Sequence, residues 1–66
     1  MKLTEEQKVI LDKVIKGKTN IVIGEEMGYA RDTIKIKVRA LIKKFHVNTR
    51  LELVREAVIL REKGLL

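Results

Sequence analysis

The chain has 66 residues, no cysteine, no proline, one histidine and a net charge of +6. This length allows one small domain over residues 1–66, with a core near the lower limit for a stable fold. The lack of cysteine excludes disulfides and thiolate zinc sites, and the lone His46 argues against any other metal site. With no signal peptide and no apolar run long enough to span a bilayer, we expect a cytoplasmic protein without a membrane segment.

The first predicted helix has clear start and stop signals. Thr4 to Gln7 forms a capping box, in which the threonine hydroxyl covers a free backbone N–H and the glutamine reaches back. Gly17 then supplies the left-handed residue that ends a helix over residues 4–16. The apolar stripe between these signals has three- and four-residue spacing. It consists of Ile10, Leu11, Val14 and Ile15.

The last predicted helix is marked in the same way. Thr49 to Glu52 has the pattern of a second capping box, and Gly64 ends the helix, which we expect over residues 50–63. The helix has an apolar stripe of its own. Its members are Leu53, Val54, Ala57, Val58 and Leu60.

Two patterns conflict in the middle of the chain. Ile21–Ile23 is a β-branched run and Thr33–Val38 alternates apolar and polar residues, as two strands of a hairpin around Gly28 would. The alternation is short, whereas an apolar stripe at helical spacing runs well past it. That stripe consists of Ile34, Val38, Leu41, Ile42 and Phe45. The longer pattern predicts helices over residues 20–27 and 31–45, and therefore an all-α domain of four helices.

Three residues have the spacing of a helix-turn-helix unit. Gly24 is small enough for the two helices to approach closely, Gly28 can adopt the positive φ of the turn, and Ile34 can hold the helices at a steep angle. Either Thr19 or Asn20 would cap the first of these helices.

Most of the excess charge lies in one quarter of the chain. Residues 31–46 hold six cations and one acid, a net charge of +5 out of the total of +6. A basic block within one predicted helix is the electrostatic footprint of a phosphate-binding face, although lysines also occur on any solvated helix. The concentration of charge favours the phosphate-binding interpretation.

Short motifs along the chain match one known family in order and spacing. They are Leu3-Thr4, Gly17, Asn20, Ile23, Thr33-Ile34-Lys35, Lys44-Phe45, Val47, Arg50 and Gly64-Leu65. Together they make residues 3–65 resemble the LuxR/GerE-type helix-turn-helix DNA-binding domain. The resemblance implies a bacterial transcription regulator whose third helix enters the major groove of double-stranded DNA. It also implies a twofold dimer interface on the fourth helix.

By position, the resemblance assigns DNA base contacts to Lys35, Ile36 and Arg39. Lysine and arginine can donate to guanine, and Ile36 can contact a thymine methyl group. The alternative for Ile36 is an ordinary exposed aliphatic residue. For the fourth helix, the resemblance implies a homodimer. Its expected contacts are Val54, Val58, Ile59 and Arg61.

Contacts with the DNA backbone are expected from a second group. Family positions that face phosphates are matched by Asn20, Thr33, Lys44 and Arg50, and the basic block adds Arg31, Lys37 and Lys43. Asn20 and Thr33 have an alternative role as local caps. Arg50 has one as the partner of a helix terminus.

The chain also departs from the family pattern. Ala30 replaces the serine or threonine that caps the third helix, Lys37 replaces a histidine, and Gln7 replaces a glutamate. Ile21 and Val22 stand where the family prefers lysine and glutamate, so they form a possible surface for a protein partner of the LuxR-type family. The alternative is that neighbouring side chains cover them.

No set of residues resembles a catalytic centre, and we expect no enzyme, cofactor or small-molecule ligand. The sequence therefore predicts a sequence-specific regulator that binds a pseudo-palindromic operator as a homodimer. The alternative is a small interaction protein that pairs with a larger LuxR-type regulator and modulates it.

Overall fold

A computed structural model describes residues 2–66 of the chain, and within them it has four helices and no strand. The helices are α1 (Glu5–Ile15), α2 (Asn20–Met27), α3 (Arg31–Lys44) and α4 (Arg50–Glu62). Each boundary lies within one residue of the predicted one. The extra residues in the predicted ranges are the caps Thr4, Lys16, Phe45 and Lys63. The all-α, four-helix prediction is confirmed.

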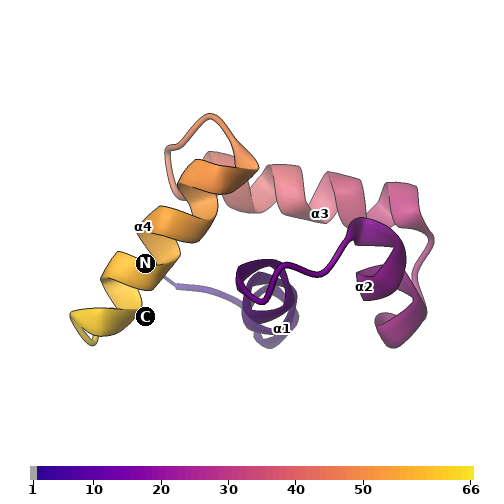
Figure 1. Ribbon diagram of the computed structural model, residues 1–66, viewed down its shortest axis with the longest axis horizontal. Helices are drawn as coiled ribbons and strands as arrows, with labels where there is room; N and C mark the ends of the chain where they lie inside the picture. Colours follow the sequence, from indigo (N-terminus) through magenta and orange to yellow (C-terminus); the bar gives the residue numbers. More distant parts are fainter. Residues whose placement is uncertain (1) are drawn as a thin grey trace.

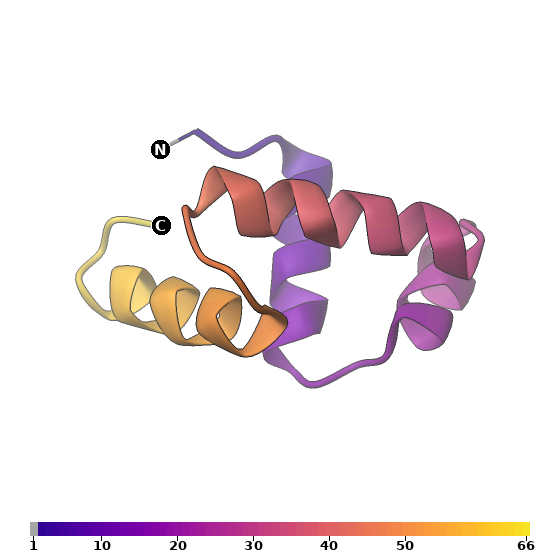
Figure 2. The same cartoon turned by 90° about the horizontal axis from the view of Figure 1, so that it is seen from above.

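The four helices are arranged around the long helix α3. Figure 2 shows α1 crossing the middle of α3, with α2 at the N-terminal end of α3 and α4 near its C-terminal half. α4 also contacts α1, so α1, α3 and α4 form a three-helix core to which α2 is added through α3. The C-terminal end of the chain lies beside α4 in both views (Figures 1 and 2).

One apolar core joins all four helices, and no polar side chain of the described residues is buried in it. Its members are Ile10, Leu11, Val14, Ile23, Ile34, Val38, Leu41, Phe45, Leu53 and Ala57. These are largely the stripes predicted from sequence spacing. The face of α3 opposite this stripe stays open to solvent.

Packing keeps α2 helical against the local β preference of its sequence. Thr19 is its N-cap and accepts a hydrogen bond from the backbone N–H three residues later, at 3.2 Å. Gly28 ends the helix with φ 78°. Gly24 is buried, and the N–H of Tyr29 donates to the Gly24 carbonyl oxygen at 2.9 Å, so the turn folds back onto the helix. The helix-turn-helix spacing is thereby confirmed.

Both ends of α3 lack the residue that such an end prefers. At its start Ala30 has the extended backbone of an N-cap, φ −68° and ψ 153°, but no side-chain oxygen to bond the free N–H groups. Just past its end His46 adopts φ 57°, the left-handed conformation that Gly17 and Gly64 provide after α1 and α4. The N–H of His46 donates to Lys43 at 3.1 Å, as in a normal helix terminus.

The two predicted capping boxes differ in the structure. In the first, the Thr4 N–H donates to Gln7 Oε1 at 2.9 Å and the Gln7 N–H donates to Thr4 Oγ1 at 3.0 Å, as expected. In the second, Thr49 Oγ1 accepts from the Glu52 N–H at 3.1 Å. Glu52, however, accepts from the N–H of Asn48 rather than from that of Thr49, so the reciprocal half of this prediction is wrong.

Candidate DNA-binding surface

One face of α3 is free of contacts with the other helices. Its exposed residues follow one another at three- and four-residue spacing, opposite the buried stripe. They are Asp32, Lys35, Ile36, Arg39, Ala40 and Lys43. Within the described residues, Lys35, Arg39 and Lys43 form no ion pair, and Ile36 is 68 % exposed. The three residues expected to contact bases therefore lie side by side on an open surface.

The middle of this face is hollowed. Ile36, Arg39, Ala40 and Lys43 line a shallow depression of about 520 Å³. Its walls are largely apolar and its polar groups are cationic donors. Donors of this kind suit the O6 and N7 acceptors of guanine in the major groove, and an aliphatic side chain suits the methyl group of thymine.

A second hollow, of about 400 Å³, lies at the start of α2. Thr19, Asn20, Arg31 and Arg50 are among its lining residues. Free N–H groups at a helix start attract anions, and the two guanidinium groups add positive charge. Arg50 donates to Asn20 Oδ1 at 2.5 Å and to the carbonyl oxygen of Lys18 at 2.7 Å. Arg50 thus ties α4 to the connection before α2 and lies beside a place suited to a phosphate.

Neither Asn20 nor Thr33 is a capping residue. Thr19 is the N-cap of α2 and Ala30 that of α3, which leaves Asn20 at the first and Thr33 at the third position of their helices. The local-cap alternative for these two residues is wrong. Their contact with phosphates stays a prediction.

Two cations of the basic block lie on another side of α3. Lys37 Nζ donates to Glu6 Oε1 at 2.9 Å and lies 4.9 Å from the ring centre of Tyr29. Lys44 Nζ donates to Gln7 Oε1 at 3.3 Å. Both lysines therefore face α1 and both are half-buried. Their sequence positions are consistent with this placement. Each lysine follows a buried residue of the apolar stripe, an isoleucine or a leucine, by three positions, which puts it beside that stripe.

Glu6 accepts hydrogen bonds from two side chains at once. The Tyr29 hydroxyl donates to one of its carboxylate oxygens and Lys37 to the other. These two donors, that of Tyr29 first, hold the pKa of Glu6 below its usual value. The same carboxylate raises the pKa of Tyr29 and that of Lys37. Sequence spacing gave no indication of this contact.

Apolar side chains are open to solvent on the outer side of α4, where the dimer contacts are predicted. Val54 and Val58 are half-buried and Ile59 is exposed, which leaves apolar surface on that face. Leu51, which the sequence reasoning missed, is 60 % exposed and lies three and seven residues before the two valines, on the same side. Arg61 instead points toward α1.

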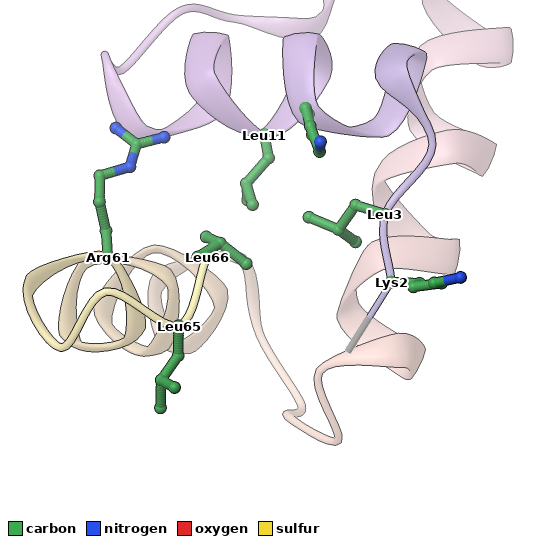
Figure 3. A pocket seen from close by; sticks show the side chains of 7 residues that line it. Lys2, Leu3, Leu11, Arg61, Leu65 and Leu66 are labelled. Atoms are coloured by element: carbon green, nitrogen blue, oxygen red, sulfur yellow. The ribbon is translucent and has the colours of Figure 1, made fainter.

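Arg61 lines a pocket of about 490 Å³ between α1 and the C-terminal end of the chain (Figure 3). Leu3, Leu11 and Leu66 point into this pocket from three sides, while the Arg61 side chain extends to α1. There its guanidinium lies 3.5 Å from Asp12 Oδ1. Arg61 is therefore part of the packing between α1 and α4.

Ile21 and Val22 are 54 % and 37 % exposed, so neighbouring side chains do not cover them. Ile21 also lines a small hollow of about 340 Å³ with Ala30 and Arg31, next to the start of α3. This apolar surface therefore borders the candidate DNA-binding surface.

Within residues 2–66, no group of three or more histidine, cysteine, aspartate or glutamate side chains is placed to hold a metal ion. No helix in that range has both the length and the apolar character needed to cross a membrane.

Comparison with known proteins gave one match. The family model GerE, described as bacterial regulatory proteins of the luxR family, matches residues 1–57. Neither a curated protein nor a solved structure matches the chain. The match covers most of the 66 residues, including the helix-turn-helix unit and the open basic face of α3. The chain therefore belongs to the luxR family of bacterial regulatory proteins and is a helix-turn-helix DNA-binding domain.

Proposed function

We propose that this protein is a sequence-specific transcription regulator that binds a pseudo-palindromic operator as a homodimer. The observation that supports this most is the open face of α3, where Lys35, Ile36 and Arg39 lie together. A helix of this length fits the major groove with such a face toward the bases. Two copies related by a twofold axis would place two α3 helices in successive grooves, about one helical turn of DNA apart.

Base recognition is assigned to three side chains. Arg39 and Lys35 donate to guanine, and Ile36 contacts a thymine methyl group. The 68 % exposure of Ile36 leaves its side chain free for this contact.

Phosphate contacts are assigned to residues that flank this face. Lys43 lies at the C-terminal end of the face, and Asn20, Arg31 and Arg50 surround the hollow at the start of α2, with Thr33 nearby on α3. Lys44 reaches a phosphate by leaving its 3.3 Å bond to Gln7. Lys37 takes no direct part, because Glu6 and Tyr29 hold its ammonium group on the side of α1.

Dimerisation is assigned to the apolar side of α4, formed by Leu51, Val54, Val58 and Ile59. Arg61, three residues after Val58, borders this side of α4 and pairs with Asp12 of the same copy at 3.5 Å. A small core gains stability when apolar surface is covered by a second copy. We expect Leu51→Glu to shift the protein toward monomers in sedimentation analysis. Leu65 is about as exposed as Leu51 but lies outside α4, so the control variant Leu65→Glu should leave the dimer intact.

Selection from a random duplex library at near-physiological salt tests the whole proposal. We expect enrichment of a twofold motif, and loss of that enrichment for Arg39→Ala. Lys8→Ala serves as the control, because it removes the same charge from α1, and Lys8 lines the pocket near the C-terminal end of the chain rather than the face of α3 or the hollow at the start of α2. Weak, salt-sensitive binding with no enriched motif would overturn the proposal.

A second candidate function rests on the exposure of Ile21 and Val22. In this case the protein pairs with a larger luxR-type regulator and modulates its DNA binding. Titrating the protein into such a regulator bound to its own operator tests this possibility. If the wild type displaces the regulator from its operator and the Ile21→Lys variant does not, this function is supported. If the variant displaces the regulator as strongly as the wild type, the surface formed by Ile21 and Val22 is excluded.

A further inference from the structure

We propose that Glu6 is a positioning residue for α3: by holding Tyr29 and Lys37 together, it sets how the helix is presented to DNA. This inference rests on the proposed function of α3. Glu6 itself lies on α1 and has no place in the proposed DNA interface.

The geometry links three parts of the chain through one carboxylate. Glu6 lies in the first turn of α1, Tyr29 in the turn between α2 and α3, and Lys37 in the middle of α3. One carboxylate oxygen accepts from the Tyr29 hydroxyl, and the other accepts from Lys37 at 2.9 Å. The ammonium group also lies 4.9 Å from the Tyr29 ring centre, within range of a cation–π contact. The three side chains therefore form a closed triangle.

The triangle anchors the start of α3, where the helix has no capping side chain of its own. Ala30, the N-cap of α3, offers no side-chain hydrogen bond, so the first turn lacks its usual anchor. Tyr29 directly precedes that cap, and Lys37 lies two turns further along the helix. Glu6 therefore holds the chain on both sides of the weak turn. In doing so it constrains the rotation of α3 about its axis, which decides where Lys35 and Arg39 point.

The residues of the triangle also explain a departure from the family pattern. Lys37 stands where the pattern has a histidine, and its ammonium group is turned inward. Charge-assisted hydrogen bonds to a carboxylate that is partly shielded from water are stronger than neutral ones. The Tyr29 hydroxyl and then Lys37 lower the pKa of Glu6, and Glu6 raises the pKa of Lys37, so each of the two charged groups stabilises the charged form of the other.

Glu6→Gln tests the positioning role, and Glu5→Gln is its matched control. Glu5 is the adjacent acid and is exposed, and its only ion pair within residues 2–66 is with Lys8, at 3.4 Å. Each variant raises the net charge by one, which by itself strengthens binding to all DNA. Affinities are measured for the duplex recovered by selection and for a scrambled duplex. We expect Glu6→Gln to lower affinity for the selected duplex by roughly three- to tenfold and not for the scrambled one.

Glu5→Gln is expected to leave the preference between the duplexes unchanged. A Glu6→Gln variant that behaves like Glu5→Gln on both duplexes overturns the positioning role. Tyr29→Phe, which removes only the hydroxyl donor, should shift the preference in the same direction as Glu6→Gln. If the wild type itself shows no preference between the duplexes, the proposed function fails instead.

The triangle can also be observed without DNA. The chain has one tyrosine and no tryptophan, so ultraviolet absorbance of tyrosinate reports on Tyr29 alone. Glu6→Gln should lower the titration midpoint of Tyr29 relative to the wild type, and Glu5→Gln should not. Circular dichroism checks that each protein stays folded through the titration. Equal midpoints in the wild type and Glu6→Gln would show that the contact is absent in solution.

Discussion

The backbone of Tyr29 lies directly against the α-carbon of Gly24. The Tyr29 N–H donates to the Gly24 carbonyl oxygen at 2.9 Å, and a methyl group on Gly24 would overlap the carbonyl oxygen of Tyr29. Because the obstacle is backbone, no side-chain rotation can relieve it. This contact sets how closely the turn approaches α2, and with it the placement of α3.

Gly24→Ala should therefore destabilise the domain by about 1–3 kcal/mol through overpacking. Helix propensity alone predicts the opposite sign, since alanine is better than glycine in a helix by about 1 kcal/mol. Urea unfolding followed by circular dichroism measures the change. Ala40 lies on the exposed face of α3, so the control variant Ala40→Gly measures the effect of helix propensity on stability without an effect of packing. A Gly24→Ala protein as stable as the wild type would contradict the close contact.

Ala30→Ser should stabilise the domain by about 1 kcal/mol, because a serine oxygen can bond free N–H groups at the start of α3. The backbone of Ala30 already has the extended conformation of an N-cap. Thr19→Ala is the converse test, since it removes the side chain that caps α2 and should cost a similar amount. Thermal unfolding of both variants checks the prediction, and a lower midpoint for Ala30→Ser would show it to be wrong.

Glu26 should make the stability of the fold depend on pH in the acid range. Hydrogen bonds from Lys13 and then Lys18, each at 2.7 Å, lower its pKa from 4.5 to about 2. A carboxyl group with a lowered folded-state pKa stabilises the fold above its unfolded pKa, and this stabilisation is lost as the pH falls through the folded value. The wild type should thus exceed Glu26→Gln in stability at neutral pH, with the difference vanishing between about 4.5 and 2.

Urea unfolding at a series of pH values measures this difference. Glu25→Gln is a matched control, because Glu25 has no ion pair within the described residues. If the difference in unfolding free energy between the wild type and Glu26→Gln stays constant across the acid range, the lowered pKa of Glu26 is contradicted.

Arg39→Ala and Lys43→Ala should weaken DNA binding in different ways. Arg39→Ala should cost about 1–3 kcal/mol at the selected operator and relax the preference at one base pair. Lys43→Ala should weaken binding to every duplex alike and reduce the salt slope by about 1. Binding measured over a range of salt concentrations separates the two effects, and equal behaviour of both variants would remove the division between base and phosphate contacts.

The sequence was sufficient for the parts of the fold that depend on neighbouring residues. Capping by Thr4, positive φ at Gly28 and the apolar stripe of α3 all follow from spacings within a few turns of helix. The open position of Ile36 followed in the same way, because it breaks the stripe of its own helix.

Contacts between distant residues could not be predicted in this way. Lys37 meets Glu6 across 31 positions, and Arg61 meets Asp12 across the packing of α1 and α4. The exposure of Leu51 was missed because it depends on which side of α4 the other helices cover. These features depend on how the helices pack against one another.

The β-branched run Ile21–Ile23 is helical here only because Ile23 enters the core and the turn folds onto Gly24. The alternating segment Thr33–Val38 is likewise helical because Ile34 and Val38 are buried. Unfolding would release both segments at once, close together in a chain that has no proline to interrupt strand pairing. The native packing of Ile23, Ile34 and Val38 therefore also keeps these two segments from pairing as strands.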